Sequence, residues 1–307
     1  MNFDEIETFL SVVQHENIAR AASELFIGQG TASSRIQHLE QELGISLFFR
    51  QKGIKNVTLT PEGENFLPIA QQMTALLRQA GQIRNRMVFQ ELRIGAVDTL
   101  NQFHFIKVYR DFMEKNPTVR LFLQTEHSTE LHQLIENQQI DLGFVFSLHK
   151  FPNVTALPLY REESVILYHR NSRFGQTGDP GDLRGEDEIY QTYGNAYDLW
   201  HRQHFPDSDM RKLSVGTFSM LPHFIDLAGS WAILPRSLAE RMAGEREDLA
   251  WTPFSSDPPP ARTAYLLRYK YAKPWVQELG GLFLREVTEM VRANPAMELL
   301  YPEGREG

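Results

Sequence analysis

Apolar residues recur at helical spacing along residues 17–43, and one break divides this stretch into two helices. The apolar positions lie three, four or seven residues apart, which is the spacing of one face of an α-helix. They are Ile18, Ala21, Ala22, Leu25, Ile36, Leu39 and Leu43. Asn17 is a good N-cap for the first helix, and residues 27–30 interrupt the pattern with glycines that tolerate turn geometry. The pattern therefore predicts two helices joined by a tight turn.

The second helix, which we expect to begin near Gly30 or Thr31, has an outward face of short polar groups and long hydrogen-bond donors. This face is typical of a helix that lies in the major groove of DNA, with its first turn against base edges. The residues expected to contact the groove are Gln29, Gly30, Thr31, Ser33, Ser34, Arg35 and His38. A helical hairpin with a solvated face has the same pattern, so these residues alone leave both interpretations open.

Two short apolar segments flank a polar tip directly after the second helix. Residues 44–50 end the helix and enter a strand, residues 51–56 form the tip, and residues 57–60 return as a second strand. A ribbon of this kind after a helix-turn-helix is a wing, and its basic tip can contact the phosphate backbone. The expected phosphate contacts are Arg50, Lys52 and Lys55. The wing favours the DNA-binding interpretation.

A heptad pattern follows the second strand. Thr60 is expected to cap a long helix with Pro61 at its first position, where the missing N–H does no harm. Apolar residues then recur at alternating steps of three and four, at Phe66, Ile69, Met73, Leu76, Ala80, Ile83 and Met87. Such a seam predicts a coiled-coil homodimer through residues 62–88. The alternative is a helix docked on its own domain, but we favour the dimer because the seam lies between two domains.

Strands alternate with helices over residues 92–292, after a first helix at residues 3–15. The expected strands are residues 92–97, 119–124, 141–146, 164–169, 231–234, 249–254 and 262–268, and the expected helices are residues 101–115, 129–138, 196–205, 219–228, 236–242 and 274–292. The alternation predicts an α/β domain with mainly parallel strands. The tail from Asn294 is expected to be mobile.

Composition limits the classes of protein to consider. The length of 307 residues is that of two or three domains. The chain has no cysteine, which excludes disulfides, thiolate metal sites and cysteine nucleophiles. Its start is acidic rather than a signal peptide, and no segment approaches the ~18 apolar residues of a membrane span. We therefore expect a cytoplasmic protein with no membrane partner.

The net charge of −8 has to be located along the chain, because an acidic protein is not a simple nucleic-acid binder. Residues 1–60 hold five Lys/Arg and seven Asp/Glu, and four of the five cations fall between Arg35 and Lys55. The charge near the contact surface matters more for DNA binding than the net charge, since the Debye length is only ~8 Å at physiological salt. The basic footprint is present but thin, so we expect modest affinity for DNA per protomer.

The first sixty-odd residues resemble the N-terminal domain of LysR-type transcriptional regulators. The matching positions are Phe9, Ala21, Ala22, Leu25, Gln29, Ser33, Ile36, Leu39, Glu40, Leu43, Gly44, Leu47, Phe48, Arg50, Leu59, Thr60 and Gly63. The chain departs from the family pattern at Gly28, Gly30 and Arg35, where Ser, Pro and Gln are common. Glycine at an N-cap costs only a few tenths of a kcal/mol relative to serine.

The resemblance, looser over the rest of the chain, implies a multidomain regulator. It implies an all-α winged helix-turn-helix domain at residues 1–60, a linker and dimerisation helix at 61–91, and an α/β effector-binding domain at 92–293. The effector-binding domain would consist of two periplasmic-binding-protein-like subdomains, the first at 92–160 with 267–293 and the second at 161–266. A tail at 294–307 would follow. The chain would cross between the subdomains near Tyr160 and Leu266. The implied partners are a double-stranded DNA operator, a second copy in a homodimer that assembles into a homotetramer, and a small-molecule effector, often a carboxylate.

Polar groups at strand–helix junctions point to an effector site. Open α/β sheets bind ligands at strand carboxyl ends, beside helix N-termini that attract anions. The expected effector-binding residues are Asp98, Thr99, Leu100, Ser128, Thr129, Phe144, Phe146, Phe218 and Ser219. The hydroxyls of Thr99, Ser128 and Ser219 are equally suited to plain N-capping, and core packing is the alternative for the phenylalanines. Asp98 would repel an anion unless it points away, so the charge of the effector stays open.

No other motif indicates a catalytic or metal site. His201 and His204 lie near Asp207 and Asp209, but their spacing matches no closed metal site. No phosphate-binding loop, dinucleotide motif or nucleophile elbow occurs in the sequence. We therefore predict a DNA-binding transcriptional regulator that binds an effector and has no catalytic residue, metal or cofactor. The alternative is a metabolite-binding protein or enzyme with a structural helical N-terminal domain.

Overall fold

The computed structural model describes residues 1–49, 57–85, 90–206, 213–227 and 229–302, with the backbone alone for 78–85. It contains two compact units. The N-terminal unit comprises residues 1–89 with 137–139, and the C-terminal unit comprises residues 90–136 and 140–307. No helix in the described part is both long and apolar enough to span a bilayer.

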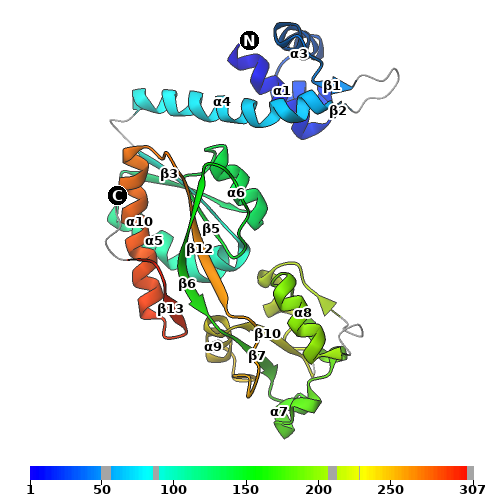
Figure 1. Cartoon of the computed structure of the whole chain (residues 1–307), viewed down its shortest axis with the longest axis vertical. Coiled ribbons are helices and arrows are strands. Elements are labelled where there is room, and N and C mark those ends of the chain that lie inside the picture. The colour runs from blue at the N-terminus through cyan, green and yellow to red at the C-terminus, as the bar shows by residue number, and fades with distance from the viewer. Residues whose placement is uncertain (50–56, 86–89, 207–212, 228, 303–307) are drawn as a thin grey trace. The chain divides into compact units, whose positions relative to one another are not determined.

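Three helices form the centre of the N-terminal unit (Figure 1), as the sequence predicts. They are α1 (Phe3–His15), α2 (Ile18–Glu24) and α3 (Gln29–Leu43). Asn17 caps α2, since its side chain accepts hydrogen bonds from the backbone N–H groups of Ala19 and Arg20. Gly44 ends α3 with a left-handed φ of 68°, which glycine adopts without a steric penalty.

The core of this unit centres on Phe9 of α1. Its ring lies 5.4 Å from that of Phe48 and 5.2 Å from that of Phe66. The other buried apolar residues of this core come from all three helices, the ribbon and the following helix, and they are Ile6, Val12, Ala21, Ile36, Leu39, Leu47 and Ala70. Of the apolar positions read from the sequence in residues 17–43, this core contains Ile18, Ala21, Ile36, Leu39 and Leu43.

The wing is present as two short antiparallel strands, β1 (Phe48–Phe49) and β2 (Thr58–Leu59). The predicted phosphate contacts Arg50, Lys52 and Lys55 lie outside the described residues. Beside the ribbon, Gly63 has no room for a side chain, because a Cβ atom there would lie 2.2 Å from the backbone oxygen of Leu47.

The linker helix α4 (Pro61–Asn85) begins as predicted. The hydroxyl of Thr60 accepts from the N–H of Gly63 at 3.0 Å and donates to the carbonyl of Ser46 at 2.6 Å. This hydroxyl therefore caps α4 and ties it to the segment before the wing.

The predicted coiled-coil seam divides into two parts. Phe66 is only 6% exposed and Met73 packs against the same core, so these residues stabilise their own domain. Ile69 and Leu76 are 51% and 53% exposed. The side chains of Ala80 and Ile83, and all of Met87, lie outside the described residues. A single seam through all seven positions is therefore wrong: part of it follows the alternative, a helix docked on its own domain.

A six-stranded sheet organises the first lobe of the C-terminal unit, in the order β13-β6-β12-β5-β3-β4. The strands are β3 (Gln90–Ala96), β4 (Val119–Thr125), β5 (Leu142–Val145), β6 (Val154–Glu162), β12 (Arg262–Tyr269) and β13 (Met297–Leu299). The helices of this lobe are the π-helical η1 (Leu100–His104), α5 (Phe105–Lys115), α6 (Ser128–Glu136) and α10 (Pro274–Ala293).

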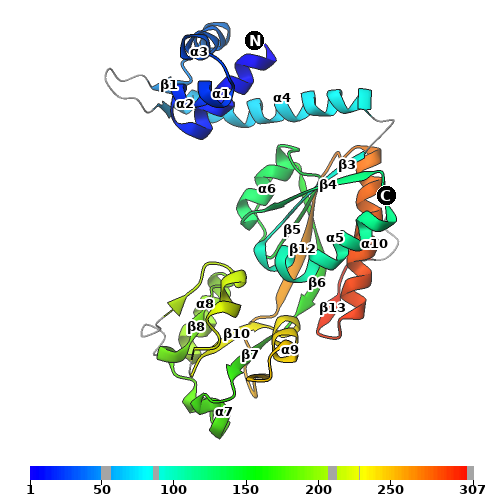
Figure 2. The same ribbon diagram turned by 180° about the vertical axis from the view of Figure 1, so that it is seen from behind.

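Helices cover both faces of this sheet, as Figure 2 shows from behind. Phe144 packs on Phe105 of α5 and Phe283 of α10, whereas the next residue, Val145, packs with Leu131 of α6. Successive side chains of a strand point to opposite faces. The apolar run along β5 is therefore explained by burial on both sides.

A smaller antiparallel sheet, β10-β7-β11, organises the second lobe. Its strands are β7 (Ser164–His169), β10 (Trp231–Pro235) and β11 (Leu249–Thr252), and the parallel pair β8 (Ile189–Tyr190) and β9 (Leu213–Ser214) lies beside them. The helices are α7 (Arg173–Thr177), the 3₁₀ turns η2 (Pro180–Asp182) and η3 (Gly185–Asp187), α8 (Asn195–His204), the 3₁₀ turn η5 (Phe218–His223) and α9 (Arg236–Glu245).

Several sequence expectations for the C-terminal unit need correction. The pairing is not mainly parallel, because β12 runs antiparallel to both β5 and β6 and the second sheet is antiparallel throughout. Strand β6 was missed: it contains Pro158, a poor strand residue that lies at a register shift in the pairing with β12. The helix expected at 219–228 is the short η5 instead.

The ends of the first lobe also differ from expectation. The chain returns to the six-stranded sheet at Arg262, the first residue of β12, rather than near Leu266. Within the tail that we expected to be mobile, Met297–Leu299 forms β13 and pairs with β6. The sequence gave only a weak signal for β13, because three residues are too few to show the alternation of a strand.

The exposed part of α4 leads to a test of the predicted dimer. We expect Leu76→Glu to dissociate the dimer without unfolding the chain, because Leu76 is exposed in the monomer and would bury like charges only in a paired seam. Analytical ultracentrifugation measures the mass and circular dichroism the fold.

Phe66→Glu is the contrasting variant, and we expect it to unfold the N-terminal unit because it places a charge in the core. An unchanged mass for Leu76→Glu would show that this face of α4 does not hold the dimer together.

Candidate functional site

The N-terminal turn of α3 presents polar groups to solvent. Gln29, Thr31 and Ser34 are exposed, and Ser33 is half-buried. The N-cap is Gly28, which offers no side-chain oxygen to the first-turn N–H groups. These N–H groups keep their capacity to bind an external acceptor such as a phosphate oxygen.

Arg35 is held against α1 rather than extended from α3. Its guanidinium donates to Asp4 Oδ2 at 2.6 Å and to the hydroxyl of Thr8 at 3.4 Å. The side chain is only 23% exposed. The predicted contact of Arg35 with a base remains a prediction, and it requires Arg35 to move away from Asp4 or to reach DNA with the ion pair intact.

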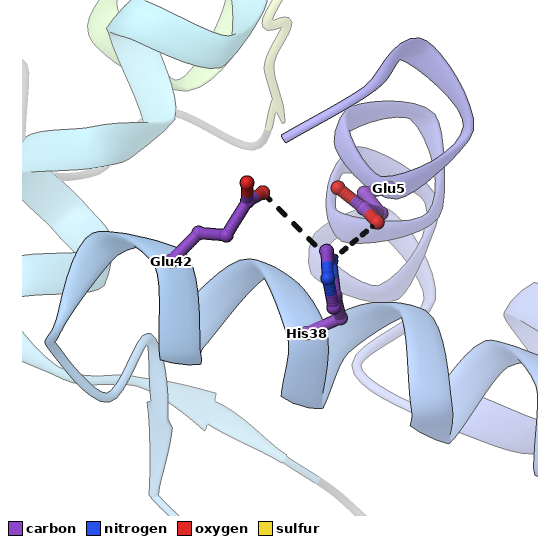
Figure 3. A group of neighbouring side chains, drawn as sticks. All are labelled: Glu5, His38 and Glu42. Carbon is purple, nitrogen blue, oxygen red and sulfur yellow. Dashed lines mark hydrogen bonds and ion pairs between the residues drawn. The ribbon is translucent and has the colours of Figure 1, made fainter.

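His38 also bridges α3 and α1 (Figure 3). Its Nδ1 lies 2.8 Å from Glu5 Oε1 and 3.7 Å from Glu42 Oε2. Burial alone would raise the pKa of Glu5, but the hydrogen bonds from the Asn2 backbone and from His38 outweigh burial and hold it below its ordinary value. Glu5 thus positions His38 while it completes the capping box of α1 with Asn2.

The turn between α2 and α3 carries an exposed aromatic ring that the sequence pattern did not predict. Phe26 is 95% exposed and has a left-handed φ of 55°, which is unusual for a bulky residue. It lies three positions before Gln29, which is the first residue of the predicted recognition helix. Its apolar character alone gives no signal, since apolar residues are normally taken as core.

A cavity of about 440 Å³ opens in the C-terminal unit, at the carboxyl ends of β3, β4 and β5. Its volume is within the range of small-molecule sites. Segments of both lobes line it: Val97, Asp98, Thr99, Thr125, Glu126, His127, Ser128, Phe146 and Ser147 from the first, and Gln191, Thr192, Tyr193, Gly194, Gly216 and Thr217 from the second, with Arg262 at the start of β12.

Four of the nine predicted effector residues line this cavity, namely Asp98, Thr99, Ser128 and Phe146. Thr99 makes no side-chain capping bond, so the N-capping alternative does not describe it. Leu100 and Phe144 are fully buried in the core of the first lobe, in one cluster with apolar residues of α5 and α10. Thr129 lies one position too far along α6 and contacts His149 instead.

Asp98 and Ser219 are joined across the two lobes. The backbone N–H of Ser219 donates to Asp98 Oδ2 at 3.1 Å, and its hydroxyl lies 3.0 Å from that of Thr217. Phe218 is buried under the cavity, stacked on Tyr193 at 5.3 Å. The carboxylate that could have repelled an anion is therefore engaged, and Thr217 rather than Ser219 lines the cavity.

Two family models match the chain. Residues 3–64 match the bacterial regulatory helix-turn-helix protein of the LysR family, and residues 86–286 match the LysR substrate binding domain. The chain belongs to the LysR family of transcriptional regulators.

Curated relatives of this LysR-family chain are named as transcriptional regulators. The regulator YofA of Bacillus subtilis is 25% identical over 95% of this chain and 100% of its own length. The regulator HdfR of Yersinia pestis is 26% identical over 76% of this chain and 81% of its own.

Solved structures share the fold over most of the chain. Full-length CbnR in complex with its target DNA has a TM-score of 0.65 and 20% identity, covering 94% of this chain and 100% of that one. A full-length variant of OxyR from Pseudomonas aeruginosa has a TM-score of 0.63 and 19% identity, covering 94% of both chains. The winged helix-turn-helix and the two-lobed α/β domain are therefore the architecture of this LysR-family chain.

The two histidines considered as metal ligands lie in separate polar contacts. His201 Nε2 is 2.6 Å from Glu188 Oε1 in a fully buried pair. His204 stacks on Trp200 at 4.5 Å and contacts Asp257 at 2.9 Å. Asp207 and Asp209 lie outside the described residues.

The sequence pattern did not predict the cavity wall formed by the loops of the second lobe and by Arg262. Gln191, Tyr193 and Thr217 stand in loops next to β8 and β9, which are two residues long and show no period. Arg262 is the first residue of the largely apolar strand β12, and an arginine at that position was the available sequence signal for a polar site.

Glu162 is a buried acid at the point where β6 leads into the second lobe. It is 2% exposed, its Oε2 accepts from the hydroxyl of Ser237 at 2.7 Å, and its Oε1 has no partner in the described part of the chain. Burial raises the pKa of Glu162 to about 7, although Ser237 and Arg262 oppose the shift.

The raised pKa predicts a pH-dependent effect of Glu162→Gln on stability. The folded state holds a proton on Glu162 more tightly than the unfolded state, so this stability is present below the ordinary value of 4.5 and lost as pH rises to about 7. We expect the variant to match the wild type at low pH and to exceed it by up to about 3 kcal/mol above neutrality.

Denaturant unfolding of both proteins across this pH range measures the difference. A difference in unfolding free energy that does not change with pH would show that Glu162 keeps an ordinary pKa in the folded protein.

Proposed function

We propose that this LysR-family regulator binds operator DNA through the N-terminal turn of α3 and its wing, and binds a small-molecule effector in the cavity of its C-terminal unit. The proposal rests on one combination: an exposed polar helix start after a helix-turn-helix, in the same chain as a ligand-sized cavity. It includes no catalytic step and places the protein in the cytoplasm, where DNA is available.

Support for DNA binding comes from the surface of α3. Gln29, Thr31 and Ser34 can hydrogen-bond to base edges, and the uncapped first-turn N–H groups can bind a phosphate. Because Arg35 and His38 are bonded to α1, base readout falls first to the three residues at the helix start. Because one protomer makes few contacts with DNA, this surface favours binding by a dimer, which presents two such helices.

Support for effector binding comes from the position of the cavity between two lobes. A ligand that contacts both walls favours one closure of the lobes, and it shifts the population toward that closure. The Asp98–Ser219 hydrogen bond already links the walls. The ligand can therefore act on an existing contact between the lobes. The difference between its affinities for the more open and the more closed lobes sets how far the population of conformers shifts.

The alternative function is a metabolite-binding protein or enzyme with a structural helical domain. Binding to the DNA beside its own gene separates the two, because the alternative gives no operator affinity. The cavity alone does not discriminate, since both interpretations bind a small molecule there.

We expect Gln29→Ala to weaken operator binding by about 1–3 kcal/mol through loss of one base contact. Gln41→Ala is the matched control: it removes the same exposed side chain at the opposite end of α3 and should leave affinity unchanged. Fluorescence anisotropy with a duplex from the region upstream of the gene measures both.

Equal losses for Gln29→Ala and Gln41→Ala, or no loss for either, would contradict the proposed docking of α3. Failure of the wild-type protein to prefer the operator over an unrelated duplex would contradict DNA recognition itself.

A further inference from the structure

Two ionisable residues face each other where the chain passes between the lobes of the C-terminal unit. Glu162 is the last residue of β6, which leads into the second lobe, and Arg262 is the first residue of β12, which returns to the first. They lie directly opposite each other in the antiparallel pairing of these strands. Side chains in such positions lie on one face of the sheet, with Cβ atoms about 4.5–5.5 Å apart. A change of rotamer is therefore enough to bring their charged groups together.

In the structure, each of the two side chains contacts other groups. Glu162 Oε2 accepts from the hydroxyl of Ser237 at 2.7 Å, and although both residues are described, the charged groups of Glu162 and Arg262 are not within 4.0 Å of each other. The guanidinium carbon of Arg262 is 3.8 Å from the ring centre of Phe146 and 4.4 Å from that of Tyr193. Phe146 belongs to the first lobe and Tyr193 to the second. Arg262 therefore links the lobes by stacking.

Each of the two residues also has one covered polar atom without a partner. Glu162 Oε1 and Arg262 Nη1 are both covered by protein, and neither has a hydrogen-bond partner among the described residues. Covered polar atoms are nearly always paired in folded proteins, because leaving them unpaired is costly. A hydrogen bond between these two atoms would satisfy both. Two arrangements are therefore open to Arg262: stacked between the rings, or paired with Glu162.

The charge of Glu162 decides between the two arrangements. A neutral carboxyl attracts the guanidinium only weakly, so Arg262 keeps its aromatic contacts. A buried carboxylate needs a paired cation, and Arg262 is the cation directly opposite. Because burial raises the pKa of Glu162 to about 7 against the opposing effects of Ser237 and Arg262, the carboxyl changes its charge close to neutrality.

The other ionisable groups on the inner side of the pair stay neutral over this pH range. His104 of η1 stays neutral above about pH 4, because burial and the charges of Arg262 and Arg241 lower its pKa to about 4. Tyr160 of β6 and Tyr193 of the second lobe stay neutral because burial raises the pKa of each well above its ordinary value. These groups therefore do not supply a charge to Glu162.

The charged residues of the neighbouring elements α9 and β13 are already paired. Two arginines of α9 bond to glutamates one turn further along the same helix, namely Arg236 to Glu240 and Arg241 to Glu245. Glu298 of β13 bonds to Arg161 of β6 at 2.6 Å, and the β13 residue opposite Glu162 is the apolar Met297. Within the described part of the chain, Arg262 is thus the cation placed to neutralise an ionised Glu162.

We propose that the C-terminal unit senses pH through this pair: protonated Glu162 leaves Arg262 stacked between the two lobes, and ionised Glu162 draws Arg262 into an ion pair that breaks the stacked link. The inference goes beyond the proposed function, since its ligand is the proton and its response is the link between the lobes. It requires neither operator nor effector. A difference of one pKa unit for Glu162 between the two arrangements changes the ratio of their populations tenfold.

The absence of native cysteine allows a direct measurement of the separation of the lobes. Arg110→Cys on α5 and Arg202→Cys on α8 place one spin label at an exposed position of each lobe. Double electron–electron resonance measures the distance between the labels on the full-length protein, and an excess of unlabelled protein ensures that the measured pairs lie within one chain. Spectra at about pH 5 and about pH 8 cover the change in charge of Glu162.

We expect the distance distribution of the otherwise wild-type protein to change between the two pH values, with the second population rising about tenfold or more at high pH. Glu162→Gln has the shape of the protonated side chain and cannot ionise, so it should keep the low-pH distribution at both values. Arg262→Met removes the cation that moves and should also give no pH response. Glu163→Gln, which removes the adjacent exposed carboxyl, is the matched control and should respond as the wild type does.

Infrared difference spectra between the same pH values test the proton itself. A protonated carboxyl and a carboxylate absorb at different frequencies, so ionisation removes one band and adds another. We expect part of this change to be missing from Glu162→Gln and present in Glu163→Gln. Identical difference spectra for the wild type and Glu162→Gln would show that Glu162 does not ionise in this range and would overturn the inference.

Three results of the distance measurement would also overturn it: no change with pH in the wild type, a pH response that survives in Glu162→Gln or Arg262→Met, or a response that Glu163→Gln abolishes as well. Histidines titrate in the same range and are retained in Glu162→Gln, so a response that originates from them would survive there. Operator affinity is measured separately, so failure here leaves the proposed DNA binding intact. The comparison of the wild type with Glu162→Gln holds even if Arg262→Met does not fold.

Discussion

The guanidinium of Arg262 packs against the rings of Phe146 and Tyr193, and this contact joins the two lobes at the C-terminal cavity. It joins a ring at the end of β5 to a ring of the second lobe, at the residue where the chain returns to the six-stranded sheet. Burial of a charge is expensive, and the aromatic faces compensate for only part of that cost. The Nη1 of Arg262 is buried and has no acceptor in the described part of the chain.

Paired charges also organise the N-terminal unit. Asp4 and Glu5 at the start of α1 contact Arg35 and His38 of α3, so these polar contacts join the two helices. The short polar residues at the start of α3 remain exposed for DNA. The net negative charge of the chain is compatible with DNA binding because exposed charges farther from the contact surface than a Debye length are largely screened.

The sequence predicted most of the helices and much of one cavity wall, for physical reasons that can be named. Helical period and capping residues located α1, α2 and α3, and the position of hydroxyls at strand ends located Thr99 and Ser128. The opposite wall could not be predicted, because Gln191 and Tyr193 stand in loops beside two-residue strands. Phe66 misled for another reason: a heptad position looks the same whether it packs on its own domain or on a partner.

The central claim is that occupation of the cavity and binding of the operator are coupled within one molecule. Calorimetric titration of a cavity ligand into the full-length protein, alone and saturated with operator, tests this most directly. Coupling requires the two ligand affinities to differ, typically ~5–150-fold, and the ligand must change operator affinity by the same factor. Identical ligand affinities with and without operator would contradict the account.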